Sequence, residues 1–228
     1  MDASKPSDRT ANPFEELLPA VAASVFSAEL PATARLDPAE EAQTGRMVEK
    51  RLREFLHGRD CARAALQQLG FAAGAIPKGD HREPVWPEGI VGSITHSNGT
   101  AAAAVAYNKD LRAVGIDIES NEPLNDKLVE MICMPEEIAR FSPGTQGNEA
   151  KLLFSIKESI YKCLWPTVRQ YFDFKEMEIR LDKPTGTVTA TPHTEKVSPE
   201  LAAAMNIKTH INDAFVMSAA CIRTIPAQ

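Results

Sequence analysis

The sequence has few cysteines and no long apolar run, and each shortage excludes a class of protein. Its four cysteines, at positions 61, 133, 163 and 221, lie far apart and form no C-x-x-C pair. This spacing favours reduced, buried thiols over a disulfide framework or a zinc site. No apolar stretch approaches the roughly 18 residues that a membrane-spanning helix needs. The first eight residues lack the basic start and apolar run of a signal peptide. We therefore expect a cytoplasmic protein that does not enter a membrane.

An excess of positive charge is also missing. The chain has 25 Lys and Arg against 31 Asp and Glu, which gives a net charge of −6. This balance argues against bulk binding of nucleic acid, although it leaves room for local basic patches. With 228 residues, 43% of them hydrophobic and 25% charged, the chain can bury a full core. The length predicts one large domain or two closely packed halves.

The stretch 115–119, Gly-Ile-Asp-Ile-Glu, reads as a strand that runs into the polar break 120–123. Side chains alternate between the two faces of a strand, so Asp117 and Glu119 should share one face and Ile116 and Ile118 the other. Two neighbouring carboxylates repel each other unless a cation lies between them. Oxygen ligands of this kind suit Mg²⁺. The alternative is a solvated strand end with two ordinary surface acids.

An amphipathic helix is predicted from Asp37-Pro38 to Gly70, because Asp is a good N-cap and Pro suits the first helical position. Its apolar residues recur at helical spacing, at Val48, Leu52, Phe55, Ala62, Leu66 and Leu69. Arg59 interrupts this stripe just after Gly58, which could kink or break the helix. A guanidinium on a core-facing line needs an anion or carbonyl groups around it. Arg59 is therefore a ligand residue, or its side chain extends along apolar surface to reach solvent, or it pairs with an internal carboxylate.

The next segments combine turns with basic residues. Three prolines and a glycine make 76–87 a loop, and Lys78, His81 and Arg82 in it could bind phosphate or only be solvated. Asn98-Gly99 between two apolar runs is a strong hairpin signal over 90–107. With the strand that ends at Glu119, this predicts a three-stranded meander. His96 at a strand end is either structural or catalytic.

A second long helix is predicted from Glu149 to Leu164, capped by Asn148 and stopped by Trp165-Pro166. Glu158 and Lys162 lie four residues apart on its polar face, together with Lys151 and Ser155. By periodicity alone this is a surface ion pair worth about 0.3–0.5 kcal/mol.

The remaining elements are predicted as follows: a strand or two with loops over 1–36, short helices at 127–131 and 135–141, a hairpin over 177–191 and a closing strand at 214–223. Two long helices, each followed by several strands, indicate an α+β protein of two similar halves.

The residues of these motifs and their order along the chain resemble those of a known family. The stretch 115–119, followed about forty residues later by Phe-Ser-Ile-Lys-Glu-Ser-Ile-Tyr-Lys at 154–162, resembles the two signature motifs of the Sfp-type 4′-phosphopantetheinyl transferases. The resemblance extends to 59–63, 78–87 and 92–97 and covers roughly residues 46 to 166. It is closest to the branch that includes the enterobactin-pathway and mycobacterial enzymes. Thr95 stands where many members have serine, and Ile118 where some have a third acid.

The resemblance implies transfer of the phosphopantetheine arm of coenzyme A to a serine of an apo carrier protein. The metal ligands would be Asp117, Glu119 and Glu158. They would hold Mg²⁺, with Mn²⁺ as an alternative, against the coenzyme A pyrophosphate. Glu158 would act as the base, and Lys162 would stabilise the departing adenosine 3′,5′-bisphosphate. Asp117, Glu158 and Lys162 are thus the expected catalytic residues.

The resemblance also implies a set of coenzyme A-binding residues. The 3′-phosphate and adenine end would meet Arg51, Arg59 and His96, and the nucleotide pocket would be lined by Lys78, Glu83 and Pro84. Thr95 and Lys157 would add contacts, the latter to the phosphates, and Asp117, Glu158 and Lys162 would complete the list.

The fold implied by the family is a monomer built as a pseudo-dimer of two α+β halves, with coenzyme A between them. We expect an N-terminal half over 1–110 that grips the nucleotide and a C-terminal half over 111–228 that carries the metal and catalytic residues. Two other functions fit the same residues: a Mg²⁺-dependent phosphohydrolase acting on a nucleotide, and a non-catalytic coenzyme A-binding module. The client carrier, whether of fatty-acid, polyketide, siderophore or peptide synthesis, stays open.

Overall fold

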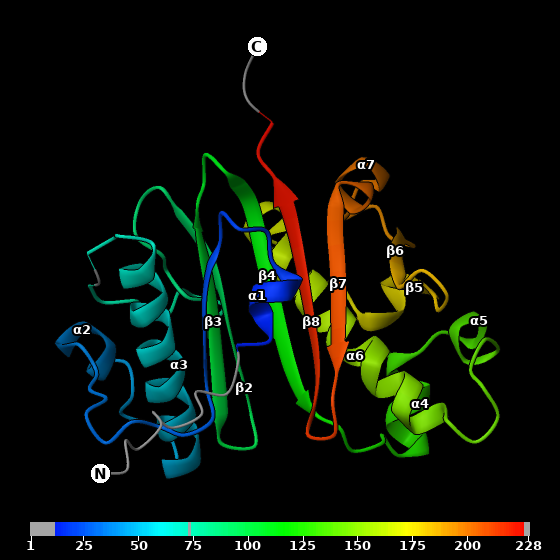
Figure 1. The fold of residues 1–228 in the computed structure, drawn as a ribbon, viewed down its shortest axis with the longest axis horizontal. Coiled ribbons are helices and arrows are strands. Elements are labelled where there is room, and N and C mark those ends of the chain that lie inside the picture. Colours follow the sequence, from blue (N-terminus) through cyan, green and yellow to red (C-terminus); the bar gives the residue numbers. More distant parts are fainter. Residues whose placement is uncertain (1–11, 73, 226–228) are drawn as a thin grey trace, which may run out of the picture.

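The protein is described by a computed structural model that covers residues 12–72 and 74–225. The expectation that the first eight residues form no signal peptide lies outside the described residues. The part described consists of two α+β units side by side (Figure 1).

The N-terminal half is a long helix packed on a three-stranded antiparallel sheet. The sheet has the order β1-β3-β2, with bounds Ala23–Ser27, Thr100–Tyr107 and Ile90–Ser97. Helix α3 (Glu49–Gln68) covers one face of it, and the short helices α1 (Phe14–Leu17) and α2 (Pro38–Glu41) complete this half (Figure 1). The β2–β3 hairpin turns at Asn98 and Gly99, which both have positive φ, as the sequence predicted.

The C-terminal half repeats this arrangement. Its sheet has the order β4-β8-β7, with bounds Leu111–Ser120, Phe215–Arg223 and Met205–Ile211, and helix α6 (Gln146–Val168) packs on it. The hairpin of β5 (Met177–Asp182) and β6 (Thr187–Pro192) forms as predicted. Short helices fill the rest: α4 (Asp126–Ile132), α5 (Pro135–Ile138), η1 (Phe174–Glu176) and α7 (Pro199–Ala203). The predicted α+β pseudo-dimer is thereby confirmed.

The predicted three-stranded meander is wrong, because β4 leaves the β2–β3 hairpin and pairs with β8. Its other edge runs beside β2, and here side chains replace the backbone ladder. The Ile116 amide donates to the Ser93 hydroxyl at 3.0 Å, and the Ile118 amide donates to the Thr95 hydroxyl at 3.2 Å. The two sheets therefore meet at β2 and β4 without merging.

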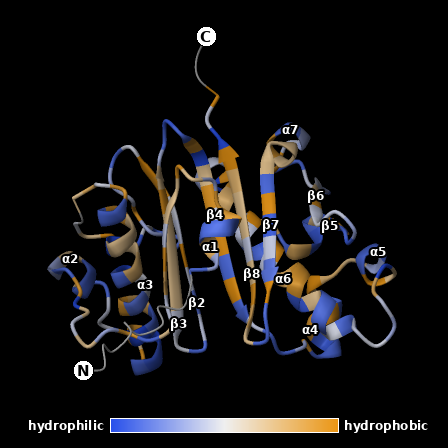
Figure 2. Ribbon diagram, viewed as in Figure 1, coloured by the Kyte–Doolittle hydropathy of each residue, from blue (hydrophilic) through white to orange (hydrophobic). Residues whose placement is uncertain are grey.

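Apolar side chains form three buried clusters. Many residues of the long helices and of the central strands are hydrophobic, as their orange shades show (Figure 2). One cluster lies between α3 and the N-terminal sheet, and a second between α6 and the C-terminal sheet. The third joins α1 to the faces of β4 and β8 and contains Ile116 and Ile118. This confirms that the isoleucines and the acids of 115–119 lie on opposite faces, because the Asp117 side chain meets α6.

Both long helices differ from the sequence prediction at their ends. The helix expected over 37–70 is divided into α2 and α3, because Gln43 leaves the helical path and exchanges hydrogen bonds with the backbone of Lys78. Val48, expected on the buried stripe, is 72% exposed. Gly58 does not break the helix, because α3 runs through it without interruption. The absence of a Cβ at Gly58 leaves space for the Ile94 side chain. Helix α6 starts three residues earlier than predicted and continues through Pro166 to Val168, although the proline has no amide to donate to the carbonyl of Lys162.

Gly115 lets α6 approach β4 closely. A Cβ at this position would lie 2.0 Å from the Ser159 carbonyl oxygen and 2.5 Å from the Cys163 nitrogen. Because both neighbours are helix backbone, no side-chain motion could relieve the clash. The glycine therefore sets the distance at which Glu158 and Lys162 of α6 face the acids of β4.

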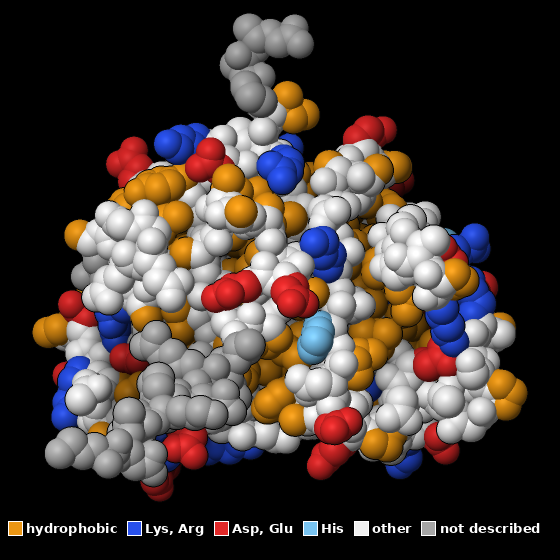
Figure 3. Space-filling view, in the orientation of Figure 1, with side chains coloured by type: hydrophobic (Ala, Val, Ile, Leu, Met, Phe, Trp, Pro, Cys, Tyr) orange, Lys and Arg blue, Asp and Glu red, His pale blue; other side chains and the backbone are white. Residues whose placement is uncertain are grey.

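The surface seen in Figure 3 carries Lys, Arg, Asp and Glu side chains that are scattered over the face, with no continuous patch of one sign. None of the helices in the described ranges is both long and apolar enough to cross a membrane. All four cysteines are buried and unpaired, as predicted.

Candidate active site

The centre of the site is a contact between Asp117 and Lys162, where α6 crosses β4. The Lys162 ammonium lies 2.6 Å from Asp117 Oδ1 and 3.3 Å from the Ile116 carbonyl oxygen. The Thr95 hydroxyl donates to the same Oδ1 at 3.1 Å. Burial disfavours the Lys162 ammonium, but Asp117 and Glu158 outweigh this effect and raise its pKa. Lys162 is thus a fixed cation at the junction of the two halves.

The two other predicted acids surround this pair. Burial, reinforced by the charge of Asp117, raises the pKa of Glu119 to about 7, while Lys151 at 3.8 Å favours its charged form. Burial and Asp117 also raise the pKa of the half-buried Glu158. Asp117 therefore lies close enough to Glu119 and Glu158 to disfavour their charged forms.

These residues fit a divalent cation by their chemistry. Asp117 Oδ2 is buried and has no hydrogen-bond partner, and the acids around it are all hard oxygen donors. Within 12–72 and 74–225, no three His, Cys, Asp or Glu side chains are already drawn together as a metal site. Lys162 instead occupies the space beside Asp117 Oδ1. A cation here would favour the charged forms of Glu119 and Glu158, whose pKa values are raised by burial and by the charge of Asp117.

Helix α3 presents a second group of polar residues beside the centre. Arg51 Nη1 lies 2.6 Å from His96 Nε2 and 3.3 Å from Glu54 Oε2. Burial and the neighbouring cations Arg51 and Lys162 lower the pKa of His96 against the opposing pull of Glu54. The structure brings Arg51 and His96 together, as the resemblance implied.

Arg59 and Lys78 flank one aromatic ring in the same half. The Arg59 guanidinium lies 4.3 Å from the centroid of the Phe55 ring, and the Lys78 ammonium lies 5.5 Å from it. Arg59 Nε donates to the Ile76 carbonyl at 2.6 Å, but its Nη2 is buried without a partner. Burial lowers the pKa of Arg59 to about 10, although Glu40 nearby favours its charge. The internal carboxylate Glu40 bonds Arg63 instead, so Arg59 retains a free donor.

A cleft of about 500 Å³ lies between the halves and reaches Lys162. Glu83 and Pro84 line it, and Glu83 accepts from Arg169 Nη1 at 3.0 Å across the junction. The His81 ring packs edge-on against Trp165 at 4.9 Å. The sequence did not indicate that Trp165 and Arg169 line this cleft, because the predicted helix ended before them.

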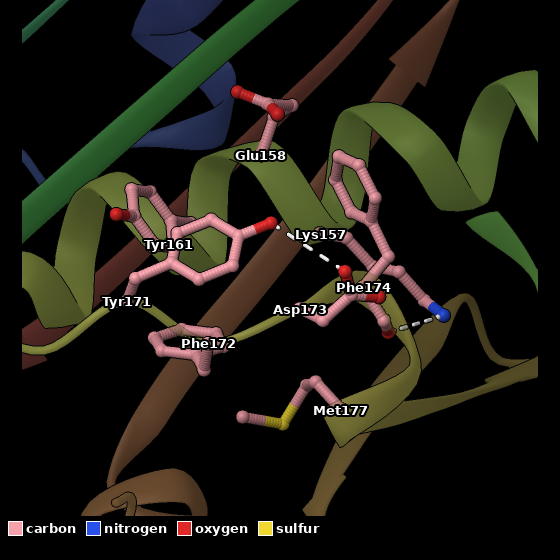
Figure 4. A pocket seen from close by; sticks show the side chains of 8 residues that line it. All are labelled: Lys157, Glu158, Tyr161, Tyr171, Phe172, Asp173, Phe174 and Met177. Atoms are coloured by element: carbon pink, nitrogen blue, oxygen red, sulfur yellow. Dashed lines mark hydrogen bonds between the residues drawn. The ribbon is translucent and has the colours of Figure 1, made fainter. Parts of the chain in front are cut away.

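The expectation that Lys157 contacts phosphates is wrong in this structure. Its ammonium is buried and donates to Glu137 at 2.7 Å, to the Ile132 carbonyl at 3.0 Å and to the Phe174 carbonyl at 2.9 Å. All three donors are thus used inside the C-terminal half. Lys157 and Glu158 leave α6 in different directions (Figure 4).

A smaller cavity of about 140 Å³ adjoins Glu158. Its walls are mainly aromatic, and Figure 4 shows these rings below Glu158, with Met177 at the base. The lining residues are Lys157, Glu158, Tyr161, Tyr171, Phe172, Asp173, Phe174 and Met177. Sequence periodicity could not have found it, because 171–174 were assigned to no element.

Together, the fold and the site define a protein of two α+β halves that presents clustered carboxylates and cations to a cleft between them. Such a cleft suits a ligand that carries phosphate groups. Comparison with known proteins identifies the family. Residues 39–106 match the 4′-phosphopantetheinyl transferase N-terminal domain, and residues 113–213 match the 4′-phosphopantetheinyl transferase superfamily.

Three 4′-phosphopantetheinyl transferases are similar in sequence to this chain. The 4′-phosphopantetheinyl transferase Npt of Nocardia iowensis is 36% identical over 82% of this chain and 86% of its own length. Svp of Streptomyces mobaraensis is 42% identical over 68% of this chain, and PptT of Mycobacterium tuberculosis 38% identical over 64%. The match spans 65% of the length of each of these two. The chain belongs to the 4′-phosphopantetheinyl transferase family, which confirms the resemblance of its motifs.

Proposed function

We propose that this protein transfers the 4′-phosphopantetheine arm of coenzyme A to a serine of an apo acyl or peptidyl carrier protein and releases adenosine 3′,5′-bisphosphate. The observation that carries the proposal is the convergence of Asp117, Glu158 and Lys162 beside the cleft between the halves. Family membership supports the reaction, and the relatives are named for the same transferase activity.

In this proposal, the carrier serine oxygen attacks the phosphorus next to the pantetheine arm, and the bond to the 3′,5′-bisphosphate breaks. Glu158 takes the serine proton, a role supported by its raised pKa and half-buried position. Lys162 stabilises the negative charge that grows on the leaving group, and its raised pKa keeps it charged at neutral pH.

Asp117, Glu119 and Glu158 would hold Mg²⁺, with Mn²⁺ as a substitute, and the ion when bound would neutralise charge on the pyrophosphate. The partnerless Oδ2 of Asp117 and the raised pKa of Glu119 support this assignment. The binding of the ion would draw Glu119 and Glu158 into their charged forms.

The nucleotide end of coenzyme A would lie against the N-terminal half. Arg51 and His96 would meet the 3′-phosphate, and Arg59 would offer its free Nη2. Lys78, Glu83 and Pro84 would line the nucleotide pocket, with Lys78 releasing part of its contact with the Gln43 carbonyl. The division of labour between halves 1–110 and 111–228 is part of this proposal.

Carrier proteins would be the partners of a monomer that acts in the cytoplasm without binding nucleic acid or membrane. Sedimentation of the purified protein tests the monomer directly. A stable dimer at micromolar concentration would contradict that part of the proposal and leave the reaction untouched.

The test of function is incubation with coenzyme A, Mg²⁺ and a panel of apo-carrier proteins, followed by mass spectrometry of the carriers. A transferase adds the phosphopantetheine mass to one serine and releases an equal amount of adenosine 3′,5′-bisphosphate. Cleavage of coenzyme A without carrier modification would instead show the phosphohydrolase. Binding of coenzyme A with no product would show a non-catalytic module.

A further inference from the structure

Lys151 is a cation beside the catalytic centre to which the transfer reaction assigns no part. Its side chain is only 10% exposed, and its ammonium lies 3.8 Å from Glu119 Oε2. Lys151 and Lys162 stand eleven positions apart on α6, which is about three turns, so both leave the helix on the same side. Each acid at the end of β4 therefore faces one lysine of α6.

The two ion pairs differ in how firmly they are held. The Lys162 ammonium donates to Asp117 Oδ1 at 2.6 Å and to the Ile116 carbonyl at 3.3 Å. Lys151 is too far from Glu119 for a hydrogen bond, and its ammonium makes none to any residue that the structure describes. Lys151 thus neutralises Glu119 by its charge alone. This contact can be given up more easily than the hydrogen-bonded contact of Lys162.

The lysines leave little net charge at the centre. Glu119 lies within the electrostatic reach of the acids Asp117 and Glu158 and of the cations Lys151 and Lys162. Three carboxylates are thus opposed by two ammonium groups. A divalent cation is attracted less strongly by this set than by the carboxylates alone, because each ammonium repels it at short range. The pyrophosphate of coenzyme A would bring further negative charge to the same place.

We propose that Lys151 is the counter-ion that the divalent cation replaces at Glu119. Before the cation binds, Lys151 neutralises Glu119 and keeps the affinity of the free protein for the cation low. The pyrophosphate of coenzyme A supplies the missing negative charge, so that the cation and coenzyme A bind cooperatively. Lys151 acts on this binding step and takes no part in breaking the phosphate bond. The inference rests on the proposed function, because it needs Glu119 to be a metal ligand.

The test compares the wild type with Lys151→Met, Lys151→Arg and Lys127→Met in the full chain. Methionine keeps the apolar stem without the charge, arginine keeps the charge, and Lys127 is an exposed lysine of α4 that serves as control. Mn²⁺ binding to the protein alone is measured by electron paramagnetic resonance at pH 8, above the pKa of about 7 to which burial raises the Glu119 carboxyl. Calorimetry gives the affinity for coenzyme A with and without Mn²⁺, and transfer to an apo-carrier gives kcat and KM.

We expect Lys151→Met to bind Mn²⁺ about 10-fold or more tightly than the wild type when no coenzyme A is present, because a charge at this distance changes an ionisation equilibrium by about that much. The factor by which Mn²⁺ improves coenzyme A binding should fall several-fold, since the two ligands are coupled reciprocally. At saturating Mg²⁺ and coenzyme A, kcat should stay within about threefold of wild type. Lys151→Arg and Lys127→Met should match the wild type in Mn²⁺ affinity within about twofold.

Weaker Mn²⁺ binding by Lys151→Met would overturn the inference and make Lys151 a residue that orients Glu119 for the cation. Unchanged Mn²⁺ affinity with a raised KM for coenzyme A would also overturn it and make Lys151 a phosphate contact, and unchanged values throughout would leave it no role. If Lys151→Met does not fold, Lys151→Gln is measured in its place under the same criteria.

The binding data also separate this inference from the proposed function. A wild-type protein that binds no Mn²⁺, with or without coenzyme A, would reject the counter-ion role of Lys151. A wild-type protein that binds Mn²⁺ and coenzyme A cooperatively but modifies no carrier would reject the transferase reaction, and the Lys151→Met affinities would still decide the inference.

Discussion

Lys162 and Asp117 form an ion pair, with Nζ 2.6 Å from Oδ1, that ties α6 to β4 beside the cleft between the halves. The Lys162 side chain is 26% exposed and that of Asp117 is 4% exposed, so the pair is not the solvated surface bridge that helical periodicity suggests for Glu158 and Lys162. The cation of α6 points to the adjoining strand, and Glu158 is left without a fixed cationic partner.

Glu158→Gln and Lys162→Met should each slow transfer by about 10²–10⁴-fold, because each removes acid–base or electrostatic assistance. Lys162→Met should act mainly on kcat, since the charge it stabilises grows on the leaving group. Single-turnover transfer at saturating coenzyme A measures both, with melting temperatures as the folding control. If both variants fold normally and keep more than about a third of the wild-type rate, Glu158 and Lys162 have no catalytic role.

Lys157→Met should destabilise the protein by about 3–5 kcal/mol, because it leaves the buried Glu137 carboxylate without its cation. Glu137 also accepts from the Met134 and Ile179 amides, so the damage should spread to α5 and β5. Urea unfolding gives the free energy of unfolding. The matched control is Lys183→Met, because the Lys183 side chain is 52% exposed and its loss should change the stability by no more than about 0.5 kcal/mol. Equal effects of the two substitutions would contradict the structural role of Lys157.

Arg59→Met should weaken binding of adenosine 3′,5′-bisphosphate while the ligand-free protein loses little stability. Methionine keeps the apolar contact with Phe55 and deletes the guanidinium whose Nη2 has no partner. Calorimetry should show at least about a tenfold loss of affinity, in line with a lost charge-assisted contact. A large drop in the ligand-free melting temperature with unchanged affinity would make Arg59 a structural residue.

His57 should make the protein less stable at mildly acidic pH. Burial lowers the pKa of this histidine below its ordinary value of 6.5. The unfolded chain therefore binds a proton that the folded protein resists, and the contribution of His57 to the free energy of unfolding should fall as the pH decreases through 6.5. Unfolding curves at pH 8 and pH 5.5 measure the difference.

The control for that prediction replaces the partly exposed His210 of β7. His57→Phe should reduce the loss of stability between pH 8 and pH 5.5, and His210→Phe should leave it unchanged. The same loss in all three proteins would exclude His57 as its source.

Local patterns predicted much of this molecule. Alternation along 115–119 correctly separated Asp117 and Glu119 from Ile116 and Ile118, and Asn98-Gly99 correctly marked a hairpin. The buried ion pair of Lys157 could not be predicted from the sequence, because α6 is buried on most sides and has no distinct polar and apolar faces. The pairing of β4 with β8 could not be predicted either, because it joins residues that lie about a hundred positions apart in the sequence. The break between α2 and α3 depends on the contact of Gln43 with Lys78, which no periodicity records.

The central claim is that Asp117 serves the reaction through a divalent cation while the N-terminal half grips the nucleotide. The most direct measurement compares wild type with Asp117→Ala in two assays: single-turnover transfer to an apo-carrier at saturating Mg²⁺, and binding of adenosine 3′,5′-bisphosphate by calorimetry. The account predicts that Asp117→Ala loses transfer by at least about 10²-fold and keeps its nucleotide affinity within a few fold. Transfer at close to the wild-type rate would contradict it.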